Sequence, residues 1–308
     1  MSSFQSDSLK PDVIPQSYIA DTCEYLQKRW NPENSEPGTV VLPIMYHSIV
    51  PKDEPVTAYS AVGEMYFHTI MQTAESLGFE AITTQQLVDF LYHNARIPPR
   101  SMILIVDDRK RAAYFDIFIP YLKKHGWKVV NAWISHPDTP AYLWAENRQL
   151  ADEGWVDFQA HGVIHNITLS EDALPEYVHQ EIYGPLTAIP EHFGVPVPLA
   201  FIWPGGRFSA YAVQVAAEAG YKIGLTVYAR GPLMYNWIPL GAEERAVENP
   251  LLVLPRAWSP NAANNLIEAA AIGDAAHAYA EQNRDSEMDW YNHYCVNYPS
   301  IPTSEAHP

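Results

Sequence analysis

Two carboxylates and two imidazoles stand at spacings that suit a metal-dependent reaction. Asp107 and Asp108 are adjacent and directly follow the apolar run Ile103–Val106. Neighbouring carboxylates repel one another unless a proton or a cation lies between them. His161 and His165 are four residues apart, so a helical turn would point both in one direction. One carboxylate and two imidazoles form a three-ligand site with open positions for water and substrate, which suits Zn²⁺, or Co, Ni, Mn or Fe.

Each of these pairs also has an ordinary explanation. Asp is favoured at helix N-caps, and the pattern predicts a helix over residues 111–124, directly after the acidic pair. Histidine pairs are also common on the surface of a chain that has 12 histidines. The metal site is favoured because both pairs follow apolar runs of the same kind, at positions that a barrel would bring together.

Apolar runs alternate with amphipathic segments through most of the chain. Seven runs read as strands: Val40–Tyr46, Phe79–Ile82, Met102–Val106, Lys128–Ile134, Val156–Gln159, Leu199–Trp203 and Ile223–Val227. Six segments between them have helical patterns: Tyr66–Leu77, Gln85–Tyr92, Ala112–Lys124, Glu146–Asp152, Glu176–His192 and Ala210–Ala219. Strands that alternate with helices indicate βαβ units and a parallel sheet. Seven units favour a barrel over an open sheet, so we predict an α/β fold, a (β/α) barrel of about seven units with parallel strands.

Polar side chains follow these runs at the points where the strands would end. In barrels of this kind the active site lies at the carboxyl ends of the strands. The residues at those ends are His47, Asp107, Asp108, Ser135, His136, His161, Pro204, Gly205 and Gly206. We therefore expect one edge of the barrel to carry the chemistry.

Composition restricts the partners. The chain has 308 residues, of which 47% are hydrophobic, as in a globular protein. Lys and Arg number 19 against 36 Asp and Glu, a formal charge of −17, which argues against nucleic acid and anionic membranes. No run of about 18 apolar residues predicts a membrane span. Residues 1–16 resemble no signal peptide, so we expect a cytoplasmic protein, or a secreted one if the N-terminus is trimmed. The oligomeric state is not indicated.

The domain organisation is predicted from changes in composition. Residues 1–38 are polar and rich in proline, and we interpret them as an N-terminal extension and linker. Residues 39–258 would form the barrel, and residues 259–308 a C-terminal helix and tail packed on it. The two cysteines, Cys23 and Cys295, are expected to be separate thiols, and a bridge between the chain ends is the alternative.

The motifs together resemble a known family. Ile105–Arg109 resembles the TFDDG motif, and His161–His165 the H-[ST]-x-x-H motif, of the polysaccharide deacetylases of the NodB-homology type, the family-four carbohydrate esterases. Phe201–Gly206 resembles their third motif, which contains Pro-x-Gly. Pro43–Ser48 and Leu254–Arg256 are similar to the subgroup that deacetylates poly-N-acetylglucosamine. The resemblance covers about residues 40–258, and motifs in the expected order are more specific than any one motif.

The resemblance implies a distorted (β/α) barrel and a role for each matching residue. Asp107 would be the catalytic base, and Asp108, His161 and His165 would hold a divalent metal, zinc first among the candidates. The turn Pro204, Gly205, Gly206 would form part of the substrate groove.

Three departures from the family pattern bear on function. Arg109 replaces the glycine of the first motif, where it would bind an anionic substrate group or obstruct a polymer. Ile202 stands where many members have an arginine that pairs with the base, and Arg256 is our candidate for that charge. The late Leu-x-His motif that supplies the general acid was not found. His47 and His136 are the substitutes by strand-end position, and His47 is preferred because Pro137 and Pro140 place His136 in an ordinary loop.

Two tryptophans are predicted to stack on sugar rings in the groove. These are Trp203 and Trp144, whereas Trp133 is expected in the core because it lies inside a strand.

We therefore predict a metal-dependent hydrolase of a non-peptide carbon–nitrogen bond, which removes acetyl groups from an N-acetylated sugar or polysaccharide. One alternative is a cytoplasmic amidohydrolase for a small linear or cyclic amide or ureide, which Arg109 favours and the intact ligand set opposes. The other is a non-catalytic carbohydrate-binding member of the family. The missing acid motif favours that alternative, and the presence of Asp107 opposes it.

Overall fold

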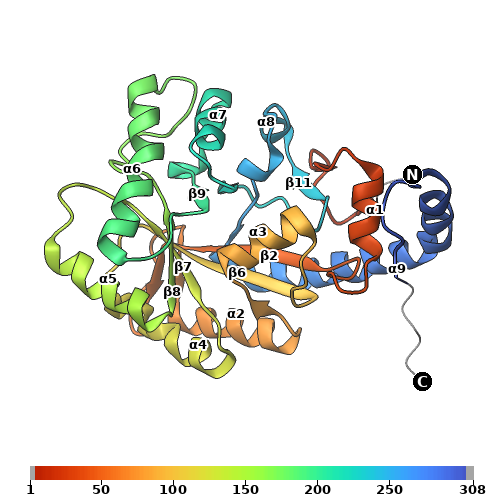
Figure 1. The fold of residues 1–308 in the computed structure, drawn as a ribbon. Coiled ribbons are helices and arrows are strands. Elements are labelled where there is room, and N and C mark those ends of the chain that lie inside the picture. Colours follow the sequence, from red (N-terminus) through yellow and green to blue (C-terminus); the bar gives the residue numbers. More distant parts are fainter. Residues whose placement is uncertain (1–3, 303–308) are drawn as a thin grey trace.

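A curled parallel sheet forms the centre of the computed structural model, which describes residues 4–302 (Figure 1). The strand order is β10-β9-β8-β7-β6-β2-β12, and β5 pairs with β6 as a branch. The strands are β2 (Val40–Tyr46), β5 (Glu80–Ala81), β6 (Arg100–Asp107), β7 (Val129–Trp133), β8 (Val156–Ala160), β9 (Ala200–Ile202), β10 (Ile223–Leu225) and β12 (Ala257–Trp258). All these pairs are parallel, and the predicted fold class is confirmed.

The register aligns the carboxyl ends of the central strands. Tyr46 of β2 is level with Val106 of β6, and Asp107 is level with Ala132 of β7. Ala160 of β8 pairs with Phe201 of β9. The residues that follow these positions therefore lie along one edge of the sheet, whatever their separation in sequence.

The segment 254–258 lies between the two ends of the sheet. Leu254 forms a parallel bridge with Leu225 of β10, and Trp258 pairs with Met45 of β2. Arg256 stands between these contacts and is buried. This closing segment escaped the sequence prediction because β12 is only two residues long.

Helices cover the outside of the sheet. They are α2 (Glu64–Ser76), α3 (Thr84–His93), α4 (Ile119–His125), α5 (Ala141–Glu153), α6 (Pro175–Phe193) and α7 (Ala210–Glu218). Thr83 and Gln86 begin α3 with a reciprocal capping box. The helix predicted over 112–124 is two elements, the 3₁₀ helix η1 (Ala112–Ile117) and α4. Pro120 explains the division, because it has no N–H to continue a helix through that point.

Shorter elements complete the chain. They are β1 (Ile14–Gln16), β3 (Ser48–Val50), β4 (Ala61–Gly63), β11 (Ile238–Leu240), α8 (Ala242–Arg245) and the 3₁₀ turns η2 (Pro204–Gly206), η3 (Pro250–Leu252) and η4 (Ser259–Asn261). The strand β1 pairs antiparallel with β11, and β3 pairs in parallel with β4.

The chain ends meet at one side of the molecule. Helix α1 (Thr22–Trp30) contacts α9 (Ala262–Tyr294), which also packs on α2 and β2. A disulfide joins Cys23 to Cys295, with 5.6 Å between their Cα atoms, so the expectation of separate thiols was wrong. The sequence separation of 272 residues hid this proximity, which depends on how α9 folds back. Among the described residues, no helix is both long and apolar enough to cross a membrane.

Candidate active site

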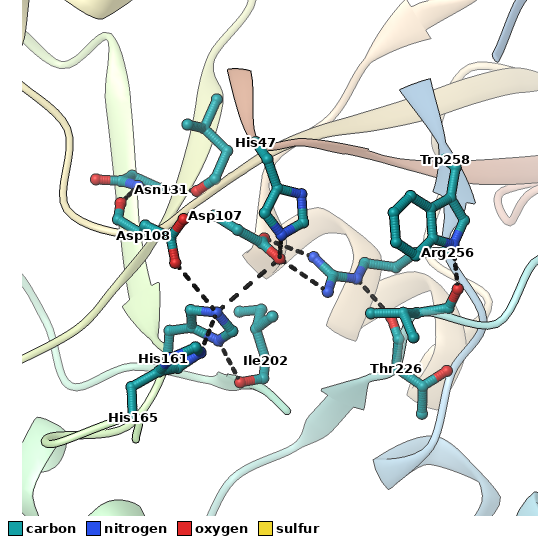
Figure 2. Close-up of polar contacts among 12 residues, drawn as sticks. His47, Asp107, Asp108, Asn131, His161, His165, Ile202, Thr226, Arg256 and Trp258 are labelled. Atoms are coloured by element: carbon teal, nitrogen blue, oxygen red, sulfur yellow. Dashed lines mark hydrogen bonds and ion pairs between the residues drawn. The ribbon is translucent and has the colours of Figure 1, made fainter. Parts of the chain in front are cut away.

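Asp107 forms a buried ion pair with Arg256. The Arg256 Nη1 donates to Asp107 Oδ1 at 2.6 Å, and Nη2 donates to Oδ2 at 3.1 Å (Figure 2). The Arg256 Nε donates to the carbonyl of Thr226 at 2.6 Å, which fixes the plane of the guanidinium. Burial opposes ionisation of Asp107, but the charges of Arg256, His161 and His47 outweigh it and lower its pKa to about 2. Asp107 is therefore a carboxylate at neutral pH.

His161 is oriented by a backbone carbonyl. Its Nδ1 lies 2.7 Å from the carbonyl oxygen of Ile202, which can only accept, so Nδ1 carries the hydrogen. That leaves the lone pair of Nε2 directed at Asp107 Oδ2 and Asp108 Oδ1, each 4.0 Å away. Burial lowers the pKa of His161 to about 4, although both aspartates oppose this shift. A neutral imidazole with its hydrogen on the far nitrogen is the form that binds a metal.

The three predicted metal ligands lie together. The Nε2 atoms of His161 and His165 are 3.0 Å apart, and ligand atoms of Asp108, His161 and His165 all lie within 4.8 Å of one another. Ligand atoms that share one tetrahedral ion at 2.0–2.2 Å are separated by about 3.3–3.6 Å. Small side-chain adjustments would bring all three into that range, so these residues fit a divalent cation.

Two of these three residues have left-handed backbones. Asp108 has φ +73° and His165 has φ +56°, a region that non-glycine residues seldom occupy. Asn131 of β7 supports the first, because its Nδ2 donates to the carbonyls of Val106 and Asp108 at 2.8 and 3.0 Å. Glu181 of α6 supports the second through the backbone of the loop that carries His165. The sequence analysis identified neither supporting residue.

His47 approaches the ion pair from the end of β2. Its Nε2 lies 3.7 Å from Asp107 Oδ2, and its ring stacks on that of Trp258 with centroids 6.2 Å apart. The side chain is 28% exposed, so it connects the buried carboxylate with solvent. His136, by contrast, accepts from the backbone of Asp138 in its own loop.

Two cations follow Asp108, a candidate metal ligand. Lys110 Nζ lies 3.6 Å from Asp108 Oδ2 and above the ring of Tyr114. Arg109 Nη1 donates to Thr139 Oγ1 at 2.9 Å, in the loop that follows β7. The sequence analysis singled out Arg109, but Lys110 is the cation that contacts the ligand set.

The predicted aromatic groove residues were wrong. Trp203 has no exposed surface and donates its indole N–H to the carbonyl of Leu252. Trp144 is also buried, because its ring stacks on His192 between helices. Both were placed by their proximity to strand ends, which does not determine the side of the sheet that a side chain faces.

The predicted turn at the end of β9 is partly accessible. Pro204 and Gly206 are buried, and Gly205 is exposed. The aromatic residues beside the site are instead Trp258 and Tyr59, whose rings lie 5.6 Å apart, and Tyr59 is 85% exposed. Trp258 follows Arg256 by two residues in the closing segment, a spacing that places both side chains on one face of a strand.

Fold and site together define a parallel (β/α) barrel with a candidate Asp–His–His metal site at the carboxyl edge of its strands. Residues 94–224 match the family model for polysaccharide deacetylases, and this range contains Asp107, Asp108, His161 and His165. The matched segment is 131 of the 308 residues, and it is similar to the family that the motifs resemble. Among curated protein sequences, none is similar enough to count as a match.

Several solved structures share the fold. The deacetylase PplD of Streptococcus pyogenes, solved in complex with acetate, is 20% identical, with a TM-score of 0.59 over 75% of this chain and 98% of that one. IcaB from Ammonifex degensii is 15% identical, with a TM-score of 0.56 over 76% and 97% of the two chains. The BpsB deacetylase domain from Bordetella bronchiseptica is 22% identical, with a TM-score of 0.52 over 71% and 96%.

Proposed function

We propose that this protein is a metal-dependent hydrolase that removes acetyl groups from an N-acetylated sugar or polysaccharide. The observation that carries the proposal is the ionised Asp107, held by Arg256 beside the set Asp108, His161 and His165. A general base must be unprotonated and fixed near the reacting water, and this carboxylate meets both conditions. A divalent cation bound to the three ligands would supply Lewis acidity to a carbonyl oxygen and make water more acidic.

Asp107 and His47 can each carry out one of the two proton transfers that the reaction requires. Asp107 accepts a proton from the attacking water, and Arg256 keeps the carboxylate oriented during the transfer. His47 lies on the exposed side of Asp107 and, when protonated, donates to the leaving nitrogen. Water adds to the acetamide carbon, the carbon–nitrogen bond breaks, and acetate and a free amine result.

Trp258 and Tyr59 support a carbohydrate substrate. Aromatic rings offer apolar faces for sugar stacking, and the exposed Tyr59 lies against Trp258, which in turn stacks on His47. The acetate in the PplD structure is the product that this reaction would release. Poly-N-acetylglucosamine remains our candidate polymer, because Pro43–Ser48 and Leu254–Arg256 resemble that subgroup.

The disulfide favours an exported location of the protein over a cytoplasmic one. Disulfides persist in oxidising compartments and are rare in the cytosol. The bridge between Cys23 and Cys295 therefore favours the secreted alternative of our localisation prediction. A free-thiol titration of the protein purified from its native compartment would detect two thiols if this interpretation is wrong.

Acetate release tests the proposed activity. The purified protein is stripped with a chelator, reloaded with Zn²⁺ or Co²⁺, and assayed on N-acetylglucosamine oligomers and on small cyclic ureides. We expect acetate from the oligomers only after metal is restored, and none from Asp108→Ala. Turnover of the ureides alone would support the small-amide alternative, and no turnover of either would support a binding protein.

A further inference from the structure

The loop Gly162–His165 carries a metal ligand outside any helix or strand. It turns through two left-handed positions, Gly162 at φ +81° and His165 at φ +56°. Regular secondary structure would hold such a segment through a ladder of backbone hydrogen bonds, but this loop lies outside any helix or strand, and its backbone bond from the N–H of Ser135 to the carbonyl of Gly162 lies at the end away from His165. The position of the His165 ring must therefore be set by contacts from elsewhere in the fold.

Glu181 supplies those contacts from inside the protein. It lies in the second turn of α6 with no exposed surface. Its Oε2 accepts from the N–H of Val163 at 2.9 Å and of His165 at 3.1 Å, and its Oε1 accepts from the N–H of Ile164 at 2.7 Å. Three consecutive amides thus converge on one buried carboxylate, the arrangement of a backbone anion-binding nest.

We infer that Glu181 is the positioning residue for His165 and thereby sets the metal affinity of the site. The inference rests on the proposed function, because it requires the three-ligand metal site. Bonds to an ionised acceptor are stronger than neutral ones, and one of them ends on the backbone of His165 itself. Groups that orient metal ligands typically change metal affinity by 10–100-fold when they are removed.

The loop is also shaped to admit this carboxylate. A Cβ at Gly162 would clash with Glu181 Oε2, so any larger residue would displace the acceptor. Both oxygens of Glu181 are used, so glutamine can keep at most one of them as an acceptor and must turn an NH₂ group toward another N–H. Glu181→Gln therefore preserves size while it breaks at least one of the three hydrogen bonds to the loop and removes the negative charge from the acceptor.

The test compares Glu181→Gln with Glu191→Gln, a matched change at an exposed position of the same helix. Zinc affinity is measured by competition with a chromophoric chelator, and the coordination of Co²⁺ by its visible absorption spectrum. We expect about 10–100-fold weaker zinc binding and an altered cobalt spectrum for Glu181→Gln, and wild-type values for Glu191→Gln.

The outcomes separate a positioning role from a merely structural one. If folded Glu181→Gln melts at a lower temperature but binds zinc like the wild type, the inference is overturned. If the wild type binds no zinc, the proposed function fails first, and the inference fails with it. Should Glu181→Gln not fold, Glu181→Asp retains the charge and withdraws the carboxylate by one methylene. Zinc binding of wild-type strength in that folded variant would equally overturn the inference.

Discussion

The carboxyl edge of the barrel and the contact between the chain ends are built on different principles. At the edge, Asp107 and Arg256 form a buried ion pair, and Asp108 and His165 hold disfavoured backbone conformations. Where α1 meets α9, a disulfide and a small apolar cluster that includes Leu26 join segments that are far apart in sequence. Disfavoured backbones persist where a site needs them, whereas the chain ends, which also contain the ion pair between Arg29 and Glu287, are joined by a covalent bond. The two regions should therefore respond separately to mutation.

The largest effect is expected at Asp107. Asp107→Asn removes the proton acceptor with little change in shape, so acetate release should fall by about 10²–10⁴-fold while bound zinc stays near one equivalent. Steady-state rates and elemental analysis of the same preparation check both statements. Wild-type activity in the variant would remove Asp107 from the mechanism.

Arg256→Met should affect both activity and stability. It leaves a buried carboxylate without its partner, a change that typically costs about 3–5 kcal/mol. In the wild type, Arg256 holds the pKa of Asp107 at about 2, so the stability from this pair is present at neutral pH and lost only as pH falls toward that value. Without the cation, burial raises the pKa, and activity should fall at a higher pH than in the wild type. Chemical denaturation measures the loss of stability, and pH–rate profiles measure the shift in activity. If the variant lost activity at the same acidic pH as the wild type, Arg256 would not control the pKa of Asp107.

The disulfide should affect stability and leave the site unchanged. The double variant Cys23→Ser, Cys295→Ser frees the two chain ends, and loss of such a bridge costs about 2–4 kcal/mol. Chemical denaturation should show this loss, whereas zinc affinity and acetate release at low temperature should match the wild type. A parallel loss of zinc affinity would mean that the two regions are coupled.

The smallest effect is expected at Arg109. The Arg109 guanidinium donates a hydrogen bond to the neutral hydroxyl of Thr139. The positive charge of Arg109 therefore remains available to an anionic substrate group. Arg109→Gly introduces the glycine of the first motif. It should raise the turnover of neutral N-acetylglucosamine oligomers a few-fold and lower the turnover of acidic substrates. Equal changes for both substrate classes would place Arg109 outside the substrate groove.

Local patterns predicted much of the fold and the proximity of the candidate ligands. The apolar run Val40–Tyr46 matches β2 residue for residue, and Asp108, His161 and His165 were identified from spacing and strand ends. Contacts that depend on tertiary packing were harder to predict. Glu181 stands among other polar residues of an amphipathic helix, and only its burial against the His165 loop distinguishes it.

Side-chain direction and long-range packing explain what the sequence did not predict. Trp203 was assigned to the groove because it ends a strand, yet its indole packs inward on Leu252. The proposal that Arg256 pairs with Asp107 came from the family pattern and is confirmed, whereas the closing strand beside it gave no local signal because β12 is only two residues long. The pairing of Cys23 with Cys295 likewise depends on the path of α9.

A structure of the zinc-loaded protein tests the metal site most directly. Asp108, His161 and His165 should each place one ligand atom about 2.0–2.2 Å from a single ion, with Asp107 still paired to Arg256. A well-ordered site in which His165 points away from the ion, or in which zinc binds elsewhere, would contradict the proposed metal-dependent deacetylase.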